Sequence, residues 1–567
     1  ELIAVASSAM SHSRPDPPPG ANAKHARDSY PIPLRPMPSH WRSLQRVFAH
    51  QARANWSKPA VSDSLGTELT YGETFLRAIA LGRVLERTLG PEPYVGILLP
   101  PLANSAVVNV ALALWGKIAV NLNYTAGQAV VDSCIQQCGI RHVISARKAL
   151  DRFKLQPTAE LVMLEDLPRK VTPLDKVWAG LVGKLVPLPL LDAYLPGFRD
   201  DRLSQPATVI FTSGSTGDPK GVVLSHGNIL ANVHAVGMHL DLKPDEVLIG
   251  ILPLFHSMGY TVTLWMSLCL GKKTVYHANP LDARIVGELC LQHKVTLLIC
   301  APTFMRTYLH KCDAECFSHL RYLVLGAEKL KPELARDIRA KLGFEALEGY
   351  GTTELSPVVA VNVPYQITLP DGRSTEGNHL GTVGRLVPGT AVKSIDPDTG
   401  EDLPPGREGL VCVKGPQVMV GYLNRPEATS KVLKDGWYNT GDLGYLDEDG
   451  FLHITGRLSR FSKVGGEMVP HEAVESAIRV AADVTEQQVA VTGLPDTKRG
   501  ERLVVLVKDL AVSPRDIVQR LNATDLPKLW IPGADDFVEV DEIPILGTGK
   551  FDLRGIRKMA EEATAVK

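Results

Sequence analysis

The sequence has no excess charge of either sign, since lysine and arginine number 61 and aspartate and glutamate 62 among 567 residues. Without such an excess, nothing favours a polyanionic partner such as nucleic acid. It also lacks a cysteine pattern: the eight cysteines are scattered, and the closest pairs have no second pair placed to complete a zinc site. A disulfide framework is therefore not expected, and the chain is typical of a reduced, cytoplasmic protein.

The chain opens without the basic, apolar and small-residue segments of a secretory leader, so export is not expected. One uncharged run, residues 94–116, matches a bilayer in length but is interrupted by Pro100 and Pro101. We interpret it as a strand at 94–98, a turn, and a buried helix N-capped by Asn104 that ends near Gly116. Repeats of solenoid period are absent from the sequence.

What is present points to an α/β protein of more than one domain, because the chain exceeds the size of a single hydrophobic core. Residues 1–38 are rich in proline and predict a disordered or linker tail. From Trp41, apolar strands alternate with helices, which predicts mixed or largely parallel sheets flanked by helices, with a β-rich subdomain from about Gly409. We expect a large domain over 39–457 and a small α+β domain over 458–567.

A segment at 177–186 has apolar residues at helical spacing, with Lys176 and Lys184 beside them and Pro187 ending the pattern. The apolar set consists of Val177, Trp178, Leu181, Val182, Leu185 and Val186. Two interpretations stay open. The helix packs on its own domain, or it lies on a membrane surface.

The sharpest local signal is a loop rich in glycine and hydroxyl groups that follows the apolar strand at 208–211. Its residues are Thr212, Ser213, Gly214, Ser215, Thr216, Gly217, Asp218, Pro219, Lys220 and Gly221. Glycines let the backbone approach an anion, and hydroxyls and Lys220 add donors, so the loop predicts a phosphate cradle. It is not a Walker P-loop, because Lys220 is followed by Gly221. Taken alone, it could equally be a flexible turn.

Four further blocks follow, each with a part that nucleotide chemistry needs. They are Glu348-Gly349-Tyr350-Gly351-Thr352-Thr353-Glu354, Trp437-Tyr438-Asn439-Thr440-Gly441-Asp442, Gly456-Arg457 and Gly547-Thr548-Gly549-Lys550. Tyr350 offers a flat face for a purine, and Glu354 a hard oxygen ligand for magnesium. Asp442 supplies an acceptor for ribose hydroxyls, and Lys550 supplies positive charge.

These blocks, in this order, resemble the adenylate-forming superfamily of acyl-CoA synthetases, adenylation domains and luciferases, from about Trp41 to the C-terminus. The resemblance implies ATP and Mg²⁺ as cofactors and a mobile small domain. It implies that the 212–220 loop holds phosphates, that Glu354 binds Mg²⁺ and that His256 lies at the acyl pocket. Further nucleotide-binding positions implied by it are Gly326, Ala327, Glu328, Tyr350, Gly351, Thr352, Thr353, Asp442 and Arg457. Lys550 would bridge the carboxylate and the α-phosphate.

The sequence departs from this superfamily at the expected hinge, where Ser459 stands in place of the usual aspartate or lysine. The loop that includes Gly465 and Gly466 otherwise matches the one that forms a pantetheine tunnel in relatives. That match favours two half-reactions, adenylation and thioester formation. A non-catalytic binding module is disfavoured, because Lys550 and Glu354 are both present.

Within the superfamily, the chain most resembles the acyl-carrier-protein synthetase half of the bifunctional bacterial 2-acylglycerophosphoethanolamine acyltransferase family. The blocks that carry this likeness are Leu252–Ser257, Leu325–Leu330, Asn362–Pro364, Gly465–Val469 and Leu546–Lys550. It implies a fatty acid substrate, acyl carrier protein as acceptor, a role in phospholipid acyl-chain recycling, and peripheral association with the cytoplasmic face of the inner membrane. In that family an acyltransferase domain precedes the ligase, which is consistent with a sequence that starts at Glu1 and not at a methionine. Coenzyme A remains the alternative acceptor.

Overall fold

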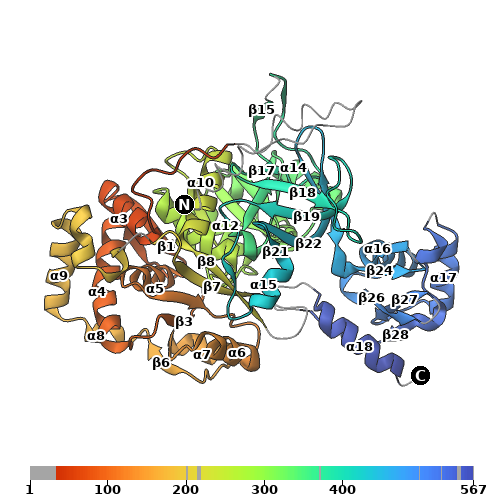
Figure 1. Ribbon diagram of the computed structural model, residues 1–567, viewed down its shortest axis with the longest axis horizontal. Coiled ribbons are helices and arrows are strands. Elements are labelled where there is room, and N and C mark those ends of the chain that lie inside the picture. Colours follow the sequence, from red (N-terminus) through yellow and green to blue (C-terminus); the bar gives the residue numbers. More distant parts are fainter. Residues whose placement is uncertain are drawn as a thin grey trace. The chain divides into compact units, whose positions relative to one another are not determined.

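The computed structural model describes residues 33–199, 202–212, 219–369, 372–465, 467–496, 499–524, 526–545 and 551–565. The described chain forms two compact units (Figure 1). Among the described residues, the first unit comprises the chain up to Thr440 and the segment Tyr445–Ile454. The second unit comprises Gly441–Gly444 and the chain from Thr455 onward. The α/β fold expected from the sequence is confirmed.

The first unit contains a seven-stranded sheet in the order β20-β8-β7-β4-β3-β5-β6. Its strands are β3 (Tyr94–Leu98), β4 (Ile118–Asn121), β5 (His142–Ser145), β6 (Glu160–Met163), β7 (Pro206–Thr212), β8 (Lys220–Ser225) and β20 (Gly421–Tyr422). Strands β4, β3, β5 and β6 pair in parallel, whereas β8 pairs antiparallel with β7. The hairpin of β7 and β8 therefore brings Thr212 and Lys220 opposite each other.

A nine-stranded sheet forms the rest of the core, in the order β17-β14-β13-β12-β11-β9-β10-β1-β2. Its strands are β1 (Pro59–Asp63), β2 (Glu68–Thr70), β9 (Val247–Gly250), β10 (Lys273–Tyr276), β11 (Leu297–Cys300), β12 (Tyr322–Leu325), β13 (Leu347–Gly351), β14 (Val358–Val361) and β17 (Arg385–Leu386). The central strands β11 and β12 are parallel and fully buried, which explains their unbroken apolar sequences. Antiparallel strands close both edges.

Helices and a third sheet complete this unit. The helices and helical turns are α3 (Leu44–Ala54), α4 (Tyr71–Thr88), α5 (Ala103–Leu114), α6 (Gln128–Cys138), α7 (Arg147–Phe153), α8 (Leu167–Lys170), α9 (Pro173–Lys184), η2 (Leu188–Ala193), η3 (Pro196–Phe198), α10 (His226–His239), the π-helix η4 (Gly259–Met266), α11 (Ser267–Cys269), α12 (Ala283–Gln292), α13 (Pro302–Lys311), η5 (Ala314–Phe317), α14 (Pro332–Leu342), η6 (Thr353–Leu355) and α15 (Pro426–Val432). The expected β-rich region is a sheet of β18 (Ala391–Ile395), β19 (Gly409–Lys414), β21 (Leu433–Lys434), β22 (Trp437–Leu446) and β23 (Leu452–Arg457), and β15 (Gln366–Thr368) pairs with β16 (Ser374–Glu376).

Two expectations about local structure need correction. Helix α5 begins at Ala103 with Leu102 as its N-cap, so Asn104 lies inside the helix and does not cap it. Residues 33–38 lack helix and strand, but Leu34 and Met37 pack against the core, so this part of the expected tail is ordered by apolar contact. No helix among the described residues is long and apolar enough to cross a membrane.

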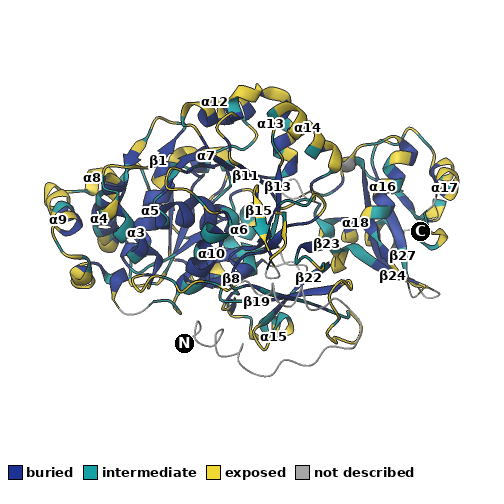
Figure 2. Ribbon diagram, turned by 90° about the horizontal axis from the view of Figure 1, so that it is seen from above, coloured by how far each residue is buried: buried dark blue, intermediate teal, exposed yellow. Residues whose placement is uncertain are grey.

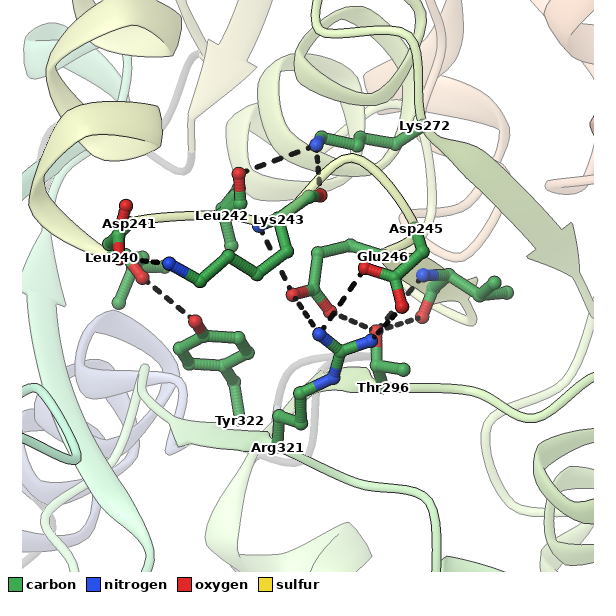
Figure 3. A network of polar contacts seen from close by, with 11 residues as sticks. Leu240, Asp241, Leu242, Lys243, Asp245, Glu246, Lys272, Thr296, Arg321 and Tyr322 are labelled. Atoms are coloured by element: carbon green, nitrogen blue, oxygen red, sulfur yellow. Dashed lines mark hydrogen bonds and ion pairs between the residues drawn. The ribbon is translucent and has the colours of Figure 1, made fainter.

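A polar network fixes the loop that follows α10 (Figure 3). The Arg321 guanidinium lies 3.1 Å from the buried Glu246 carboxylate and 2.6 Å from that of Asp245. The Tyr322 hydroxyl donates to the Leu240 carbonyl at 2.9 Å. This hydrogen bond ties the end of α10 to β12, and the Arg321 pairs partly offset the cost of burying Glu246.

The second unit is a five-stranded sheet with helices. Its elements are η7 (Leu458–Arg460), β24 (Phe461–Val464), β25 (Glu467–Pro470), α16 (His471–Ala482), η8 (Glu486–Gln488), β26 (Val489–Asp496), β27 (Gly500–Val507), α17 (Pro514–Asn522), η9 (Lys528–Trp530), η10 (Ala534–Asp536), β28 (Phe537–Glu539) and α18 (Leu553–Ala565). Two apolar clusters lie against this sheet. The sequence predicts a domain boundary after Arg457, whereas the first unit ends three residues earlier, at Ile454.

Candidate active site

The candidate site in the first unit begins where β12 and β13 end. Gly326 and Ala327 follow β12, and Tyr350 and Gly351 close β13, so the expected adenine-binding residues come from neighbouring parallel strands. Carboxyl ends of parallel strands are where α/β sheets commonly bind ligands. Ala327 has φ +72°, a left-handed conformation that is uncommon outside glycine and that often occurs at functional sites.

Gly351 is required by the close approach of two backbone segments. A Cβ atom at this position would lie 2.1 Å from the Pro357 carbonyl oxygen, so no other residue fits without movement. The tight passage turns the chain from β13 into the short helix η6. That turn presents Thr352, Thr353 and Glu354 together.

A carboxylate, a phenol and an ammonium group lie in series beside this turn. The Tyr422 hydroxyl donates to Glu354 Oε1 at 2.9 Å. Lys220 Nζ lies 5.3 Å from the centre of the Tyr422 ring, within the range of a cation–π contact. The structure thus brings the predicted Lys220 and Glu354 to one tyrosine, Lys220 at its ring and Glu354 at its hydroxyl, and both side chains are half-buried.

The threonines of the turn present further polar atoms. Thr353 Oγ1 lies 3.3 Å from Ser257 Oγ, which joins the turn to the segment that carries His256. Thr352 Oγ1 is buried and has no hydrogen-bond partner within the part of the chain that the structure describes. Buried hydroxyls are nearly always hydrogen-bonded, so this atom fits a site completed by a bound molecule.

The sequence predicted no functional role for two tyrosines of the site, Tyr422 and Tyr438. Tyr422 lies outside every motif, and Tyr438 was quoted only as part of a block. Burial, and then the charge of Glu354, hold the pKa of Tyr438 well above its usual value, so this phenol stays protonated. No sequence signal could have found Tyr422, because its role comes from the pairing of β20 with β8.

A small apolar cavity of about 30 Å³, roughly the space of one water molecule, lies between η4 and β13. It is lined from α10 by Val236 and Leu240, from η4 by Val262 and Met266, and from β13 by Tyr350. Tyr350 belongs to β13, the strand that leads into the turn with Thr353 and Glu354. His256 is half-buried, with its ring 4.5 Å from that of Phe255.

Other predicted residues have separate local contacts. The Glu328 carboxylate accepts from Thr303 at 2.7 Å. In the second unit, Arg457 Nε lies 3.5 Å from Asp442 Oδ1, Ser459 is exposed in η7, and Gly465 has φ +59°. Ser213, Gly214, Ser215, Thr216, Gly217, Gly466 and Lys550 lie outside the described residues.

Comparisons with known proteins agree with this geometry. A family pattern described as AMP-binding enzyme matches residues 48–423. The chain is 28% identical over 563 residues to the long-chain-fatty-acid–CoA ligase of Escherichia coli O6:H1, covering 93% of this chain and 96% of the relative. It is 30% identical to a feruloyl-CoA synthase of Amycolatopsis, covering 86% and 93%. ATP-bound MatB from Rhodopseudomonas palustris has a TM-score of 0.72 at 26% identity, covering 92% and 99%.

Fold and site together define an adenylate-forming enzyme. More specifically, the chain belongs to the AMP-binding enzyme family. It is an acid–thiol ligase. The resemblance found in the sequence is confirmed at this level, and the narrower likeness to carrier-protein synthetases stays a prediction.

Proposed function

We propose that this enzyme activates a long-chain fatty acid with ATP and transfers the acyl group to the thiol of coenzyme A. The observation that carries the proposal is the polar cluster of Lys220, Tyr422 and Glu354, in a chain whose residues 48–423 match the AMP-binding enzyme family. Relatives named long-chain-fatty-acid–CoA ligase that align over nearly the whole chain support the substrate and the acceptor.

The chemistry explains why these groups are needed. A carboxylate oxygen must attack the α-phosphorus of ATP while the bond to pyrophosphate breaks, so two anions meet in the transition state. Glu354 would hold Mg²⁺, which supplies positive charge to the phosphate oxygens. Lys220 adds a cation, and the unpartnered Thr352 hydroxyl is available to a nucleotide oxygen. In the second step, a thiol attacks the acyl carbonyl and AMP leaves.

Two versions of this function differ in the thiol that accepts the acyl group. The sequence favoured acyl carrier protein and phospholipid recycling, with coenzyme A as the alternative. The relatives favour the alternative, because both kinds named here make CoA thioesters. We therefore propose coenzyme A and keep the carrier protein as the competing outcome.

The first half-reaction is tested by isotope exchange between ATP and pyrophosphate. Palmitate should support the fastest exchange in a panel that also holds octanoate, ferulate, malonate and acetate. Exchange driven best by ferulate or malonate would reject the fatty acid, without rejecting adenylation. Absence of exchange with every acid, in a folded preparation, would reject the ligase proposal.

We further propose that the exposed face of α9 contacts a lipid surface. Large apolar residues that are each at least 45% exposed lie on α9 (Leu174, Val177 and Leu181) and in the segment just after it (Leu185, Leu190 and Tyr194). Figure 2 shows exposed residues along α9. Lys176 and Lys184 are exposed on the same helix, which suits an anionic surface. The opposite face packs, through Ala179 and Val182, on the enzyme itself.

A further inference from the structure

A second cavity of about 330 Å³ lies in the first unit. Its lining comes from α10, β14, the β15–β16 hairpin and β17, and includes His239, Val361, Val363, Tyr365, Ile367 and Arg385. Cavities that hold small molecules commonly measure about 300 to 1,000 Å³. The space is therefore large enough for a compact organic ligand.

Arg385, which lines this cavity, is a buried cation without a close carboxylate partner among the described residues. The residue is 7% exposed, and its Nε atom is buried without a hydrogen-bond partner. Among the described residues, none makes a hydrogen bond or an ion pair of ordinary length with its guanidinium. A buried guanidinium normally has a carboxylate or several acceptors, because desolvation of an unpaired charge is costly.

The nearest carboxylates are engaged elsewhere. Asp447 Oδ1 accepts from the backbone N–H groups of Asp449 and Phe451, at 3.1 and 2.8 Å, and Asp447 Oδ2 lies 2.9 Å from His453 Nε2. Asp449 pairs with Arg373 at 3.3 Å. Burial lowers the pKa of Arg385, and these two carboxylates only partly offset that effect. Neither therefore completes the Arg385 site.

The remaining lining is neutral. His239 Nε2 lies 2.8 Å from the Val361 carbonyl oxygen, and burial lowers the pKa of this histidine to about 4, so the ring is uncharged at neutral pH. The Tyr365 hydroxyl donates to the His239 carbonyl. The adjacent Leu240 is held by the Tyr322 network of Figure 3, so this wall is well supported.

We propose that this cavity is a binding site for an organic monocarboxylate with a short aliphatic body. The planar guanidinium of Arg385 matches a carboxylate in bidentate geometry, and Val361, Val363 and Ile367 suit the aliphatic part. A single cation favours a single negative charge over a phosphate dianion. Val361 lines both cavities, yet the two differ in all other lining residues, so this site is distinct from the apolar cavity beside Tyr350.

Photoaffinity labelling of the whole chain with a diazirine-bearing hexanoate tests the proposal. Mass spectrometry of wild type should locate the label within residues 361–385. Arg385→Met should reduce that labelling tenfold or more, and Arg385→Lys should retain an intermediate level. The uncharged hexanamide analogue should label the region weakly in every variant. These readouts do not depend on catalysis.

Matched variants separate the two cavities. Thr368→Trp fills the larger cavity from its exposed rim and should abolish the label, whereas Met258→Trp, in the smaller cavity, should leave it unchanged. The rise in thermal transition that hexanoate causes should be smaller in Arg385→Met than in wild type. Labelling of 361–385 that persists in both Arg385→Met and Thr368→Trp, or equal labelling by the amide, would overturn the proposal.

Discussion

At the scale of single residues, the site depends on one hydroxyl that orients a carboxylate. Tyr422 donates to Glu354, and its ring lies beside Lys220, so it contacts both expected charged residues. Residues that orient a metal ligand affect function nearly as much as the ligand itself. We propose that Tyr422 positions Glu354.

Tyr422→Phe should raise the Mg²⁺ concentration needed for half-maximal pyrophosphate exchange by about tenfold, because Glu354 loses the donor that orients it. The measurement is a Mg²⁺ titration of the exchange rate. Tyr445→Phe is the matched control, since Tyr445 stacks on His453 with ring centres 4.6 Å apart and should behave as wild type. An unchanged Mg²⁺ requirement in Tyr422→Phe would remove this role.

Lys550→Ala should separate the two half-reactions. If its charge serves only where carboxylate and α-phosphate meet, acyl-adenylate formation should fall by about 100-fold or more. Thioester formation from synthetic acyl-adenylate should stay within a few-fold of wild type. Rapid-quench assays of both steps on one preparation, with an unchanged thermal transition, make the comparison; equal losses would indicate a structural role instead.

The residue-scale predictions from sequence were limited by contacts between distant segments. Glu354 and Lys220 stand in recognisable motifs, and the structure brings both to Tyr422. Tyr422 is 68 positions from Glu354, and only the antiparallel pairing of β20 with β8 brings it there. Arg385 carried no signal either, because a lone arginine in sequence does not show whether it has a partner.

At the scale of elements, α9 has two faces with different surroundings. Trp178 packs beneath the Arg83 guanidinium at 4.3 Å and near Trp115, whereas Val177 and Leu181 are exposed. One face of the helix therefore packs on its own domain, and membrane contact of the exposed face stays a prediction. Helical periodicity predicted the element, although α9 ends at Lys184 and not at 186.

The double variant Val177→Glu/Leu181→Glu should weaken binding to anionic vesicles by tenfold or more, through lost apolar contact and added negative charge. Co-sedimentation with vesicles of mixed neutral and anionic phospholipid measures it. Leu65→Glu/Val480→Glu, which changes two other exposed apolar residues, is the control and should bind normally. Equal binding by all three proteins would exclude α9 as the contact.

The boundaries of β12 and the start of α10 each coincide with one strong signal in the sequence. The unbroken apolar segment at 322–325 is β12, and Ser225 with Asn228 forms a capping box that starts α10. Asn104 was wrongly taken as a cap, because α5 starts from Leu102 without any side-chain cap. A residue of a capping type marks a helix start only where its side chain accepts a hydrogen bond from a backbone N–H of the first turn.

At the scale of the whole molecule, the order of motifs was enough to predict the class of enzyme, and the family match confirms it. The same blocks could not decide the acceptor, because the identity of a thiol carrier depends on a surface assembled from distant segments. Sequence also missed the 330 Å³ cavity for this reason. A motif shows chemistry that a few residues close in sequence perform, whereas a cavity forms only when segments distant in sequence pack together.

The most direct test of the proposed function is a competition between acceptors in one reaction. The enzyme would receive palmitate, ATP and Mg²⁺ with coenzyme A and phosphopantetheinylated carrier protein at equal concentrations, and mass spectrometry would quantify both thioesters over time. Our account predicts palmitoyl-CoA as the main product, with AMP and pyrophosphate formed in equal amounts. Predominant palmitoyl-carrier protein, or no palmitoyl thioester while another acid is converted, would contradict it.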